Sequence, residues 1–211
     1  DFLSKYTEWT PIYYRPIGRT ILGDIPLPYN DKGCKKAIGF KLTQKEIIDL
    51  IFSDYSEKQW GVPFDKIPST ITNRIPKTKD CDNPTWFEGQ RYQCVPKEGY
   101  TKMFEKMLNG IDVVLGCSKD DWKNSHCDRI IYTGKIDEYF DNCYGTLPYR
   151  TLDFEHKVTS KKQDTLVYNE CNYSNMWTRK YDHSYFTEGH SGLTVITKEY
   201  SRNAEGDDIP F

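Results

Sequence analysis

The stretch Leu42-Thr43-Gln44-Lys45-Glu46-Ile47-Ile48-Asp49-Leu50-Ile51-Phe52 encodes the start of a helix near the first quarter of this 211-residue chain. Thr43 followed three residues later by Glu46 is the pattern of a capping box, in which each side chain satisfies a backbone N–H of the first turn. The apolar residues that follow recur at helical spacing: Ile47, Ile48, Leu50 and Ile51. We therefore predict a helix that begins after Thr43 and runs to about Phe52 or slightly beyond.

Strand signals lie on both sides of this helix. Residues 9–30 are rich in Pro, Tyr and Ile and contain Gly23, which predicts two short strands joined by a Gly turn. In the second half, segments of alternating polarity predict antiparallel strands at 152–157, 164–168, 176–182 and 193–200. Two apolar runs, at 111–115 and 129–133, predict buried strands.

Between these strands the chain has a second helix and a long connection. Gly99-Tyr100-Thr101 opens the helix and Asn109-Gly110 ends it, and its apolar stripe is Met103, Phe104, Met107 and Leu108. Residues 74–98 carry many charges and no clear period, so they predict a loop, either a functional lid or a disordered segment.

This segregation of strands and helices predicts an α+β fold with a small helical bundle and an antiparallel sheet. We expect residues 1–31 to supply the first strands of that sheet and residues 149–211 to supply the rest. Residues 32–110 then form a helical region that includes the 74–98 loop, and residues 111–148 carry the two isolated strands.

Composition excludes several classes of function. A net charge of −2 gives no general reason to expect nucleic acid or an anionic membrane as partner. No apolar stretch approaches the ~20 residues needed to span a bilayer. The chain has no basic-then-apolar leader and no starting Met, so we expect a processed chain or a piece of a longer one.

Cysteine and histidine positions argue against a metal site. The seven Cys are odd in number and no two are separated by two residues, so reduced thiols and a cytoplasmic location are expected, with a Cys81–Cys94 disulfide left open. His126, His156, His183 and His190 are scattered. Neither a Gly-x-Gly-x-x-Gly turn nor a phosphate-binding loop motif is present.

One cluster can carry ligand chemistry. Tyr55-Ser56-Glu57-Lys58-Gln59-Trp60-Gly61 places two aromatic residues beside a helix end, where they either stack on a base or sugar or anchor the helix terminus. This run closely resembles the Tyr-Thr-Glu-Lys-Gln-Trp-Gly motif of UDP-galactopyranose mutases. Similar blocks follow the family's order at 27–30, 74–76, 91–93, 99–102, 131–137, 149–155 and 197–200.

The resemblance implies a parent enzyme that interconverts UDP-galactopyranose and UDP-galactofuranose with reduced FAD. It also implies a UDP-sugar site in which Tyr55 stacks on the uracil and Arg179 binds the diphosphate or the sugar. The other implied contact residues are Asn30, Ile51, Phe52, Trp60, Tyr92 and Asn169. An Arg–phosphate pair is the strongest polar contact expected, because the guanidinium fork binds two oxygens.

The chain departs from the family in ways that bear on activity. The amino-terminal flavin-binding unit and the carboxy-terminal Gly-Gly-Arg segment have no counterpart in it. The family's mobile-loop Arg is replaced, because Arg74-Ile75-Pro76 is followed by Lys77, Thr78 and Lys79, which leaves only weak candidates there. We expect no FAD bound by this chain alone, no catalytic residue without it, and missing parent segments or a second chain over residues 111–133. The alternatives are a non-catalytic UDP-sugar-binding module and a degenerate structural relative.

Overall fold

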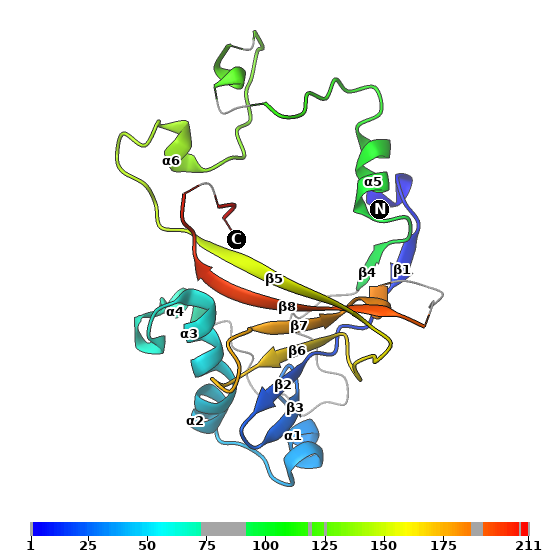
Figure 1. Ribbon diagram of the computed structural model, residues 1–211, viewed down its shortest axis with the longest axis vertical. Helices are drawn as coiled ribbons and strands as arrows, with labels where there is room; N and C mark the ends of the chain where they lie inside the picture. Colours follow the sequence, from blue (N-terminus) through cyan, green and yellow to red (C-terminus); the bar gives the residue numbers. More distant parts are fainter. Residues whose placement is uncertain are drawn as a thin grey trace.

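The computed structural model describes residues 2–72, 92–117, 120–124, 126–186, 192–206 and 208–210. Its central feature is a six-stranded sheet with the strand order β3-β2-β6-β7-β8-β5, which crosses the middle of the molecule (Figure 1). The strands are β2 (Ile17–Thr20), β3 (Gly23–Pro26), β5 (Arg150–Thr159), β6 (Val167–Glu170), β7 (Arg179–Asp182) and β8 (Thr194–Asn203). Strands and helices are segregated along the chain, which confirms the α+β prediction.

The sheet is mixed where we predicted an antiparallel one. Strand β2 pairs with β6 in parallel, whereas the other neighbours are antiparallel. The hairpin β2–β3 confirms the strands joined by a Gly turn, with Gly23 at φ +129°. Sequence periodicity identifies a strand but carries no information about the direction of a partner some 150 residues away, and this accounts for the error.

The helix predicted from the capping box is present and longer than expected. It consists of α2 (Gln44–Ile47), a π-helical stretch η2 (Ile48–Ser53) and α3 (Asp54–Trp60) in direct succession. The Thr43 backbone N–H donates to Glu46 Oε2 over 2.7 Å, and the Glu46 N–H donates to Thr43 Oγ1 over 3.3 Å. The helix ends at Gly61, whose φ of +68° is the left-handed conformation that glycine adopts at helix ends.

We expect Thr43→Ala to lower the free energy of unfolding by about 1 kcal/mol, because the N–H of Glu46 loses its capping acceptor. Urea denaturation followed by far-ultraviolet circular dichroism measures the change. Lys45→Ala, an exposed site in the same first turn, should stay within about 0.5 kcal/mol of the unmodified chain. Equal effects of the two substitutions would contradict the capping role.

A hydrophobic core joins this helix to the sheet. It is formed by Ile25, Leu27, Tyr29, Cys34, Leu42, Ile47, Ile51 and Cys171, with Ile38, Leu50 and Phe52 packed against it. Helix α1 (Asp31–Ile38), which was not predicted individually, closes the core beside β3; Asn30 caps its first turn and Gly39 ends it. In Figure 1, helices α1 and α2 lie beside strands β2 and β3, the elements that carry or flank most of these core residues.

A second, smaller unit lies beyond the other side of the sheet. Strand β1 (Trp9–Pro11) pairs with β4 (Cys94–Pro96), and α5 (Tyr100–Met107) follows. Helix α5 confirms the second predicted helix. Residues 94–96 were predicted as part of a loop, and their pairing with β1 corrects that. Most of the predicted 74–98 loop, including Cys81, lies outside the described residues.

The prediction of buried strands at 111–115 and 129–133 is wrong. Both segments run as extended chain without a strand partner, and their apolar side chains are exposed, with Leu115 at 87% and Ile131 at 82%. A strand needs a neighbour for its backbone N–H and C=O groups, and none of the described segments lies beside these two. The short helix α6 (Ile136–Tyr139) lies between the second segment and β5.

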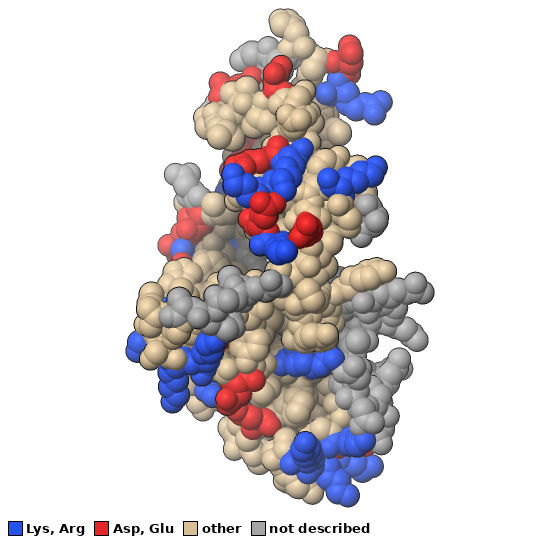
Figure 2. All heavy atoms as spheres, turned by 90° about the vertical axis from the view of Figure 1, so that its right-hand side faces the viewer, with Lys and Arg blue, Asp and Glu red and all other residues tan. Residues whose placement is uncertain are grey.

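The remaining helical turns are short: η1 (Leu3–Lys5), η3 (Phe64–Lys66), α4 (Ser69–Thr72), η4 (Asp121–Asn124) and η5 (His183–Phe186). Among the described residues, none of the helices has the length and apolar content that a bilayer crossing requires. On the face drawn in Figure 2, basic and acidic side chains are interspersed, as the small net charge leads one to expect.

Candidate functional site

A row of residues crosses the middle of the sheet on one face. In the strand registers, Gly18 of β2 lies opposite Asn169 of β6, Asn169 opposite Arg179 of β7, and Arg179 opposite Glu199 of β8. Residues directly opposite each other on neighbouring strands project their side chains to the same face. The fold thus gathers an amide, a guanidinium and a carboxylate from three strands. They lie next to Gly18, where an added Cβ would be 3.0 Å from Cys171 Sγ and 3.1 Å from Leu27 Cδ1, so the space above β2 is already filled.

Helix α3 adds an aromatic residue to this row. Arg179 donates from Nε to the hydroxyl of Tyr55 over 2.9 Å. Its Nη1 donates to the Tyr181 hydroxyl over 3.4 Å and lies 3.5 Å from Glu199 Oε1. The Tyr181 hydroxyl donates to Glu199 Oε2 over 2.9 Å, which closes the cluster. Nη2 of Arg179 has no hydrogen-bond partner in the described part of the chain, so one arm of the guanidinium fork is left for a ligand.

Burial keeps the phenols of this cluster neutral. It raises the pKa of Tyr55 to about 12, although the charge of Arg179 acts in the opposite direction. The pKa of Tyr14 is raised by burial too, and the opposing influences of Arg179 and Glu199 on it place Tyr14 beside the cluster. Burial alone would lower the pKa of Arg179, but Tyr55, Tyr181 and Glu199 outweigh it and raise that pKa, so the guanidinium stays charged.

Two buried amide side chains in this region have unsatisfied atoms. Asn169 Oδ1 has no hydrogen-bond partner among residues that the structure describes, and neither do Oε1 and Nε2 of Gln59. Gln59 follows Tyr55 by four residues on α3, and so lies on the same face of that helix. Buried amides normally find partners, so unpartnered ones beside a charged cluster indicate groups that a ligand can satisfy.

The carboxyl end of α3 is held by a strand residue. Arg150 of β5 donates from Nε to the Gln59 carbonyl and from Nη2 to the Lys58 carbonyl, each over 3.0 Å. Its Nη1 also donates to Asn203 Oδ1 of the neighbouring strand. These bonds satisfy carbonyl groups at the end of the helix. They also fix the position of Trp60, which lies between Gln59 and Gly61.

The structure brings together only some of the residues implied by the resemblance. Tyr55, Asn169 and Arg179 belong to the cluster described above. Trp60, 41% exposed, ends the same helix, and Tyr92, 79% exposed, lines a surface pocket with Tyr13 and Arg15 beside β1 and β4. Lys77, Thr78 and Lys79 lie outside the described residues.

Asn30, Ile51 and Phe52 are engaged elsewhere. The Asn30 side chain caps helix α1, accepting from the Gly33 N–H over 2.7 Å, and Ile51 is buried in the hydrophobic core against which Phe52 packs. Among the described residues, none of the three has a hydrogen bond or ion pair with Arg179. A sequence motif does not show which face of a helix a residue occupies. The contacts with the core decide that.

Several residues of the cluster were not foreseen. Tyr181 lies two residues after Arg179 on the same strand, and this spacing alone places it on the same face. Gln59 stands inside the quoted motif, four residues from Tyr55. Glu199 lies in one of the blocks that carry the resemblance, but its pairing with Arg179 depends on strand register. Tyr14 gave no local signal.

The described residues fit neither a metal ion nor a flavin. Groups of three or more His, Cys, Asp or Glu side chains suited to a metal are absent from them. Among the described strands, β2 and β6 form the one parallel pair, and most of the chain lies between these two strands in the sequence. The sequence also has no Gly-x-Gly-x-x-Gly turn at the start of a helix, which is the usual dinucleotide-binding feature. We therefore assign no step of the chemistry to a flavin held by these residues.

Comparison with known proteins gives a consistent result. A family model described as GLF, UDP-galactopyranose mutase, matches residues 50–211. The dTDP-fucopyranose mutase of Escherichia coli is 30% identical over 194 residues, which cover 86% of this chain and 51% of that protein. A probable UDP-galactopyranose mutase of Klebsiella pneumoniae is 34% identical over 173 residues, or 79% of this chain and 44% of that protein.

A third relative, the UDP-galactopyranose mutase of Mycoplasma genitalium, is 35% identical over 130 residues, which cover 56% of this chain and 32% of that protein. The chain spans about half the length of the first curated relatives it matches. The matched region contains the Tyr55–Gly61 motif, Asn169 and Arg179. Since the family model covers well over half of the sequence, this chain belongs to the UDP-galactopyranose mutase family.

Proposed function

We propose that this chain is the nucleotide-sugar-binding portion of a mutase that interconverts UDP-galactopyranose and UDP-galactofuranose. The observation that carries the proposal is the cluster around Arg179, a half-buried cation that lies beside Tyr55 and Asn169 and has one arm without a hydrogen bond among the described residues. Guanidinium groups bind diphosphate oxygens strongly, and a tyrosine ring can stack on a pyrimidine. The roles that the resemblance implies for Trp60 and Tyr92 belong to the same proposal.

The chemistry of the cluster suggests which ligand atom meets which residue. Nη2 of Arg179 is suited to a diphosphate oxygen, which carries negative charge. Asn169 Oδ1 is an acceptor and is suited to a donor, such as the ring N–H of uracil or a sugar hydroxyl. Thymine presents the same ring N–H, and one relative is named for a dTDP-sugar, so dTDP-hexoses form the second substrate class to test.

Mutase turnover is not expected from these 211 residues alone. The described residues do not fit a flavin, and the parent reaction in the family uses one. Segments of a longer parent, or a second chain, would supply it and would cover the exposed apolar residues near 111–115 and 130–131. Flavin absorbance of the purified chain tests this: a yellow protein with stoichiometric flavin would contradict it.

Titration calorimetry of the purified chain with UDP tests the binding function. We expect Arg179→Ala to weaken UDP binding by about 1.5–3 kcal/mol, the range for hydrogen bonds that involve charged groups. Arg202→Ala is the matched control, because Arg202 lies on the same sheet and pairs with Asp153 and Asp208, away from the cluster. It should leave UDP affinity unchanged. Equal affinities of the Arg179→Ala variant and the unmodified chain would contradict the proposed site.

One observation favours the alternative, a degenerate relative that binds neither UDP nor dTDP. The ion pair with Glu199 already neutralises much of the charge on Arg179. In that case the folded chain shows no heat of binding with either UDP or dTDP. A dissociation constant in a measurable range for one of them, lost in Arg179→Ala, decides for the binding module.

A further inference from the structure

Lys58 is a buried lysine whose ammonium group is enclosed by backbone carbonyls. Its side chain and backbone together are only 6% exposed. The Nζ donates to the carbonyl oxygens of Glu170 at 2.9 Å, Asn172 at 2.7 Å, Asn175 at 3.1 Å and Trp177 at 3.2 Å. All four carbonyls belong to the segment 170–177, which comprises the last residue of β6 and most of the connection to β7.

This arrangement makes the ammonium the organising centre of that connection. Carbonyl oxygens carry partial negative charge, so four of them converging on one point repel each other unless a cation lies between them. The connection has ties of its own, such as Asn175 Nδ2 donating to Glu170 Oε2 and the Ser174 N–H donating to Asn172 Oδ1. None of these internal bonds places a positive charge where the carbonyls meet.

Burying the ammonium is costly, and burial lowers the pKa of Lys58 to about 8. Glu170, the Cys171 thiol and Asp54 act in the opposite direction, and the Tyr173 ring lies 5.9 Å from Nζ. A salt-bridged surface lysine would avoid this cost. If residue 58 only stabilised the fold, an apolar side chain could take its place, because apolar residues often stabilise a buried site as well as a charge does.

The connection sets the positions of two residues of the candidate site. Asn169 lies one residue before it on β6, and Arg179 lies two residues after Trp177 on β7; the two are opposite each other in the strand register. Lys58 itself follows Tyr55 by three residues on α3. One helix therefore carries both the hydroxyl that accepts from Arg179 and the cation that holds the turn before Arg179.

We propose that Lys58 is a positioning residue for the nucleotide site: its ammonium closes the 170–177 connection and so sets Asn169 and Arg179 against Tyr55. This deepens the proposed function and rests on it for the identity of the ligand. The local ordering of the connection does not depend on any ligand, and this separates the two ideas experimentally.

Chemical rescue of Lys58→Ala tests the proposal. We expect the variant to bind UDP about tenfold to a hundredfold more weakly, because Arg179 would no longer be held in place for its charged hydrogen bonds to the ligand. Ammonium chloride should restore a large part of the affinity by placing a small cation among the carbonyls. Tetramethylammonium chloride at the same ionic strength should not, because it has no N–H donor. Lys45→Ala, exposed at the start of the same helical run, is the control and should bind as the unmodified chain does.

Amide hydrogen exchange supplies the readout that needs no nucleotide. Exchange at residues 171–178 should rise selectively in Lys58→Ala and fall again with ammonium, while the N–H groups of α5 stay unchanged. If the unmodified chain binds no UDP but this pattern appears, the proposed function fails and the ordering role of Lys58 stands.

Two results would overturn the proposal. One is unchanged exchange and unchanged UDP affinity in a folded Lys58→Ala variant; the other is a loss that ammonium does not reverse at all. If the alanine variant does not fold, Lys58→Met provides the second test. It retains an apolar chain of similar length, and a folded methionine variant with full UDP affinity would likewise rule out a need for the cation.

Discussion

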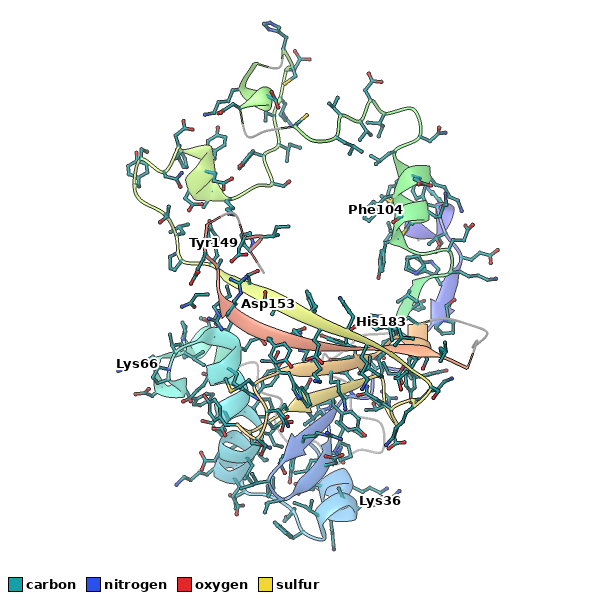
Figure 3. The ribbon with its side chains drawn as sticks, viewed as in Figure 1. Lys36, Lys66, Phe104, Tyr149, Asp153 and His183 are labelled. Carbon is teal, nitrogen blue, oxygen red and sulfur yellow. The ribbon has the colours of Figure 1, made fainter. Side chains whose placement is uncertain are left out.

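Replacing Asp182 by alanine is expected to lower the free energy of unfolding by about 3–5 kcal/mol, because three donors lose one buried acceptor. The Asp182 carboxylate is fully buried. It accepts from the N–H groups of Gln163 and Ser184 over 2.7 and 2.9 Å and from the Thr194 hydroxyl. It thereby ties the end of β7 to the connection before β6 and to the start of β8, near the labelled His183 in Figure 3.

Guanidinium chloride denaturation of the unmodified chain and the variant measures this effect. Asp164→Ala is the matched control, because it removes the same charge from an exposed site on the adjacent turn, and it should change stability by less than about 0.5 kcal/mol. A loss below about 1 kcal/mol in Asp182→Ala would show that water replaces the carboxylate and that the site is not closed.

The same residue predicts a dependence on pH. Burial alone would raise the pKa of Asp182, but the hydrogen bonds from Thr194, Gln163 and Ser184 outweigh it and lower that pKa. A depressed pKa in the folded state means that the stabilisation is complete above the pKa of the unfolded chain, at about 3.9. It is lost as the pH falls through the lower folded value. The acid side of the stability curve should therefore be flatter in Asp182→Ala than in the unmodified chain.

Gly61→Ala is expected to cost about 3 kcal/mol of unfolding free energy, the second large effect. An alanine in the left-handed conformation costs about 1–2 kcal/mol. The added Cβ would also lie 2.5 Å from Arg150 Nη1, so Arg150 must move away from the Lys58 and Gln59 carbonyls. Weakening these charged hydrogen bonds adds a cost of about 1–2 kcal/mol.

Gly39→Ala separates the two contributions to this loss. Gly39 ends helix α1 in the same left-handed region, at φ +90°, but nothing lies within 4 Å of its would-be Cβ. Its substitution should cost only the conformational part. In an Arg150→Ala background, Gly61→Ala should then cost no more than Gly39→Ala does. A double-mutant cycle by urea denaturation gives both numbers, and an additive cycle would refute the contact between Gly61 and Arg150.

Local sequence signals were sufficient for features whose physics is local. The Thr43–Glu46 capping box, the amphipathic helix at 100–107 and the long strands β5 and β8 each depend on side chains a few residues apart. The segregation of these elements was enough for the α+β class. The motif at 55–61, together with the similar blocks along the chain, was enough for the family. The motif did not reveal what most of its residues do, because their partners lie about a hundred residues away: Lys58 meets 170–177 and Gly61 meets Arg150.

The tertiary structure alone decided the features that depend on contacts between distant segments of the chain. The apolar runs at 111–115 and 129–133 have the composition of strands, but a strand exists only when a neighbour accepts its backbone hydrogen bonds. Asn30 and Ile51, which the resemblance implies as contact residues, also have partners within the fold: one caps a helix and the other packs in the core. The cluster of Tyr55, Asn169, Arg179 and Glu199 arises from strand register and helix packing, which are set by contacts between segments far apart in the chain.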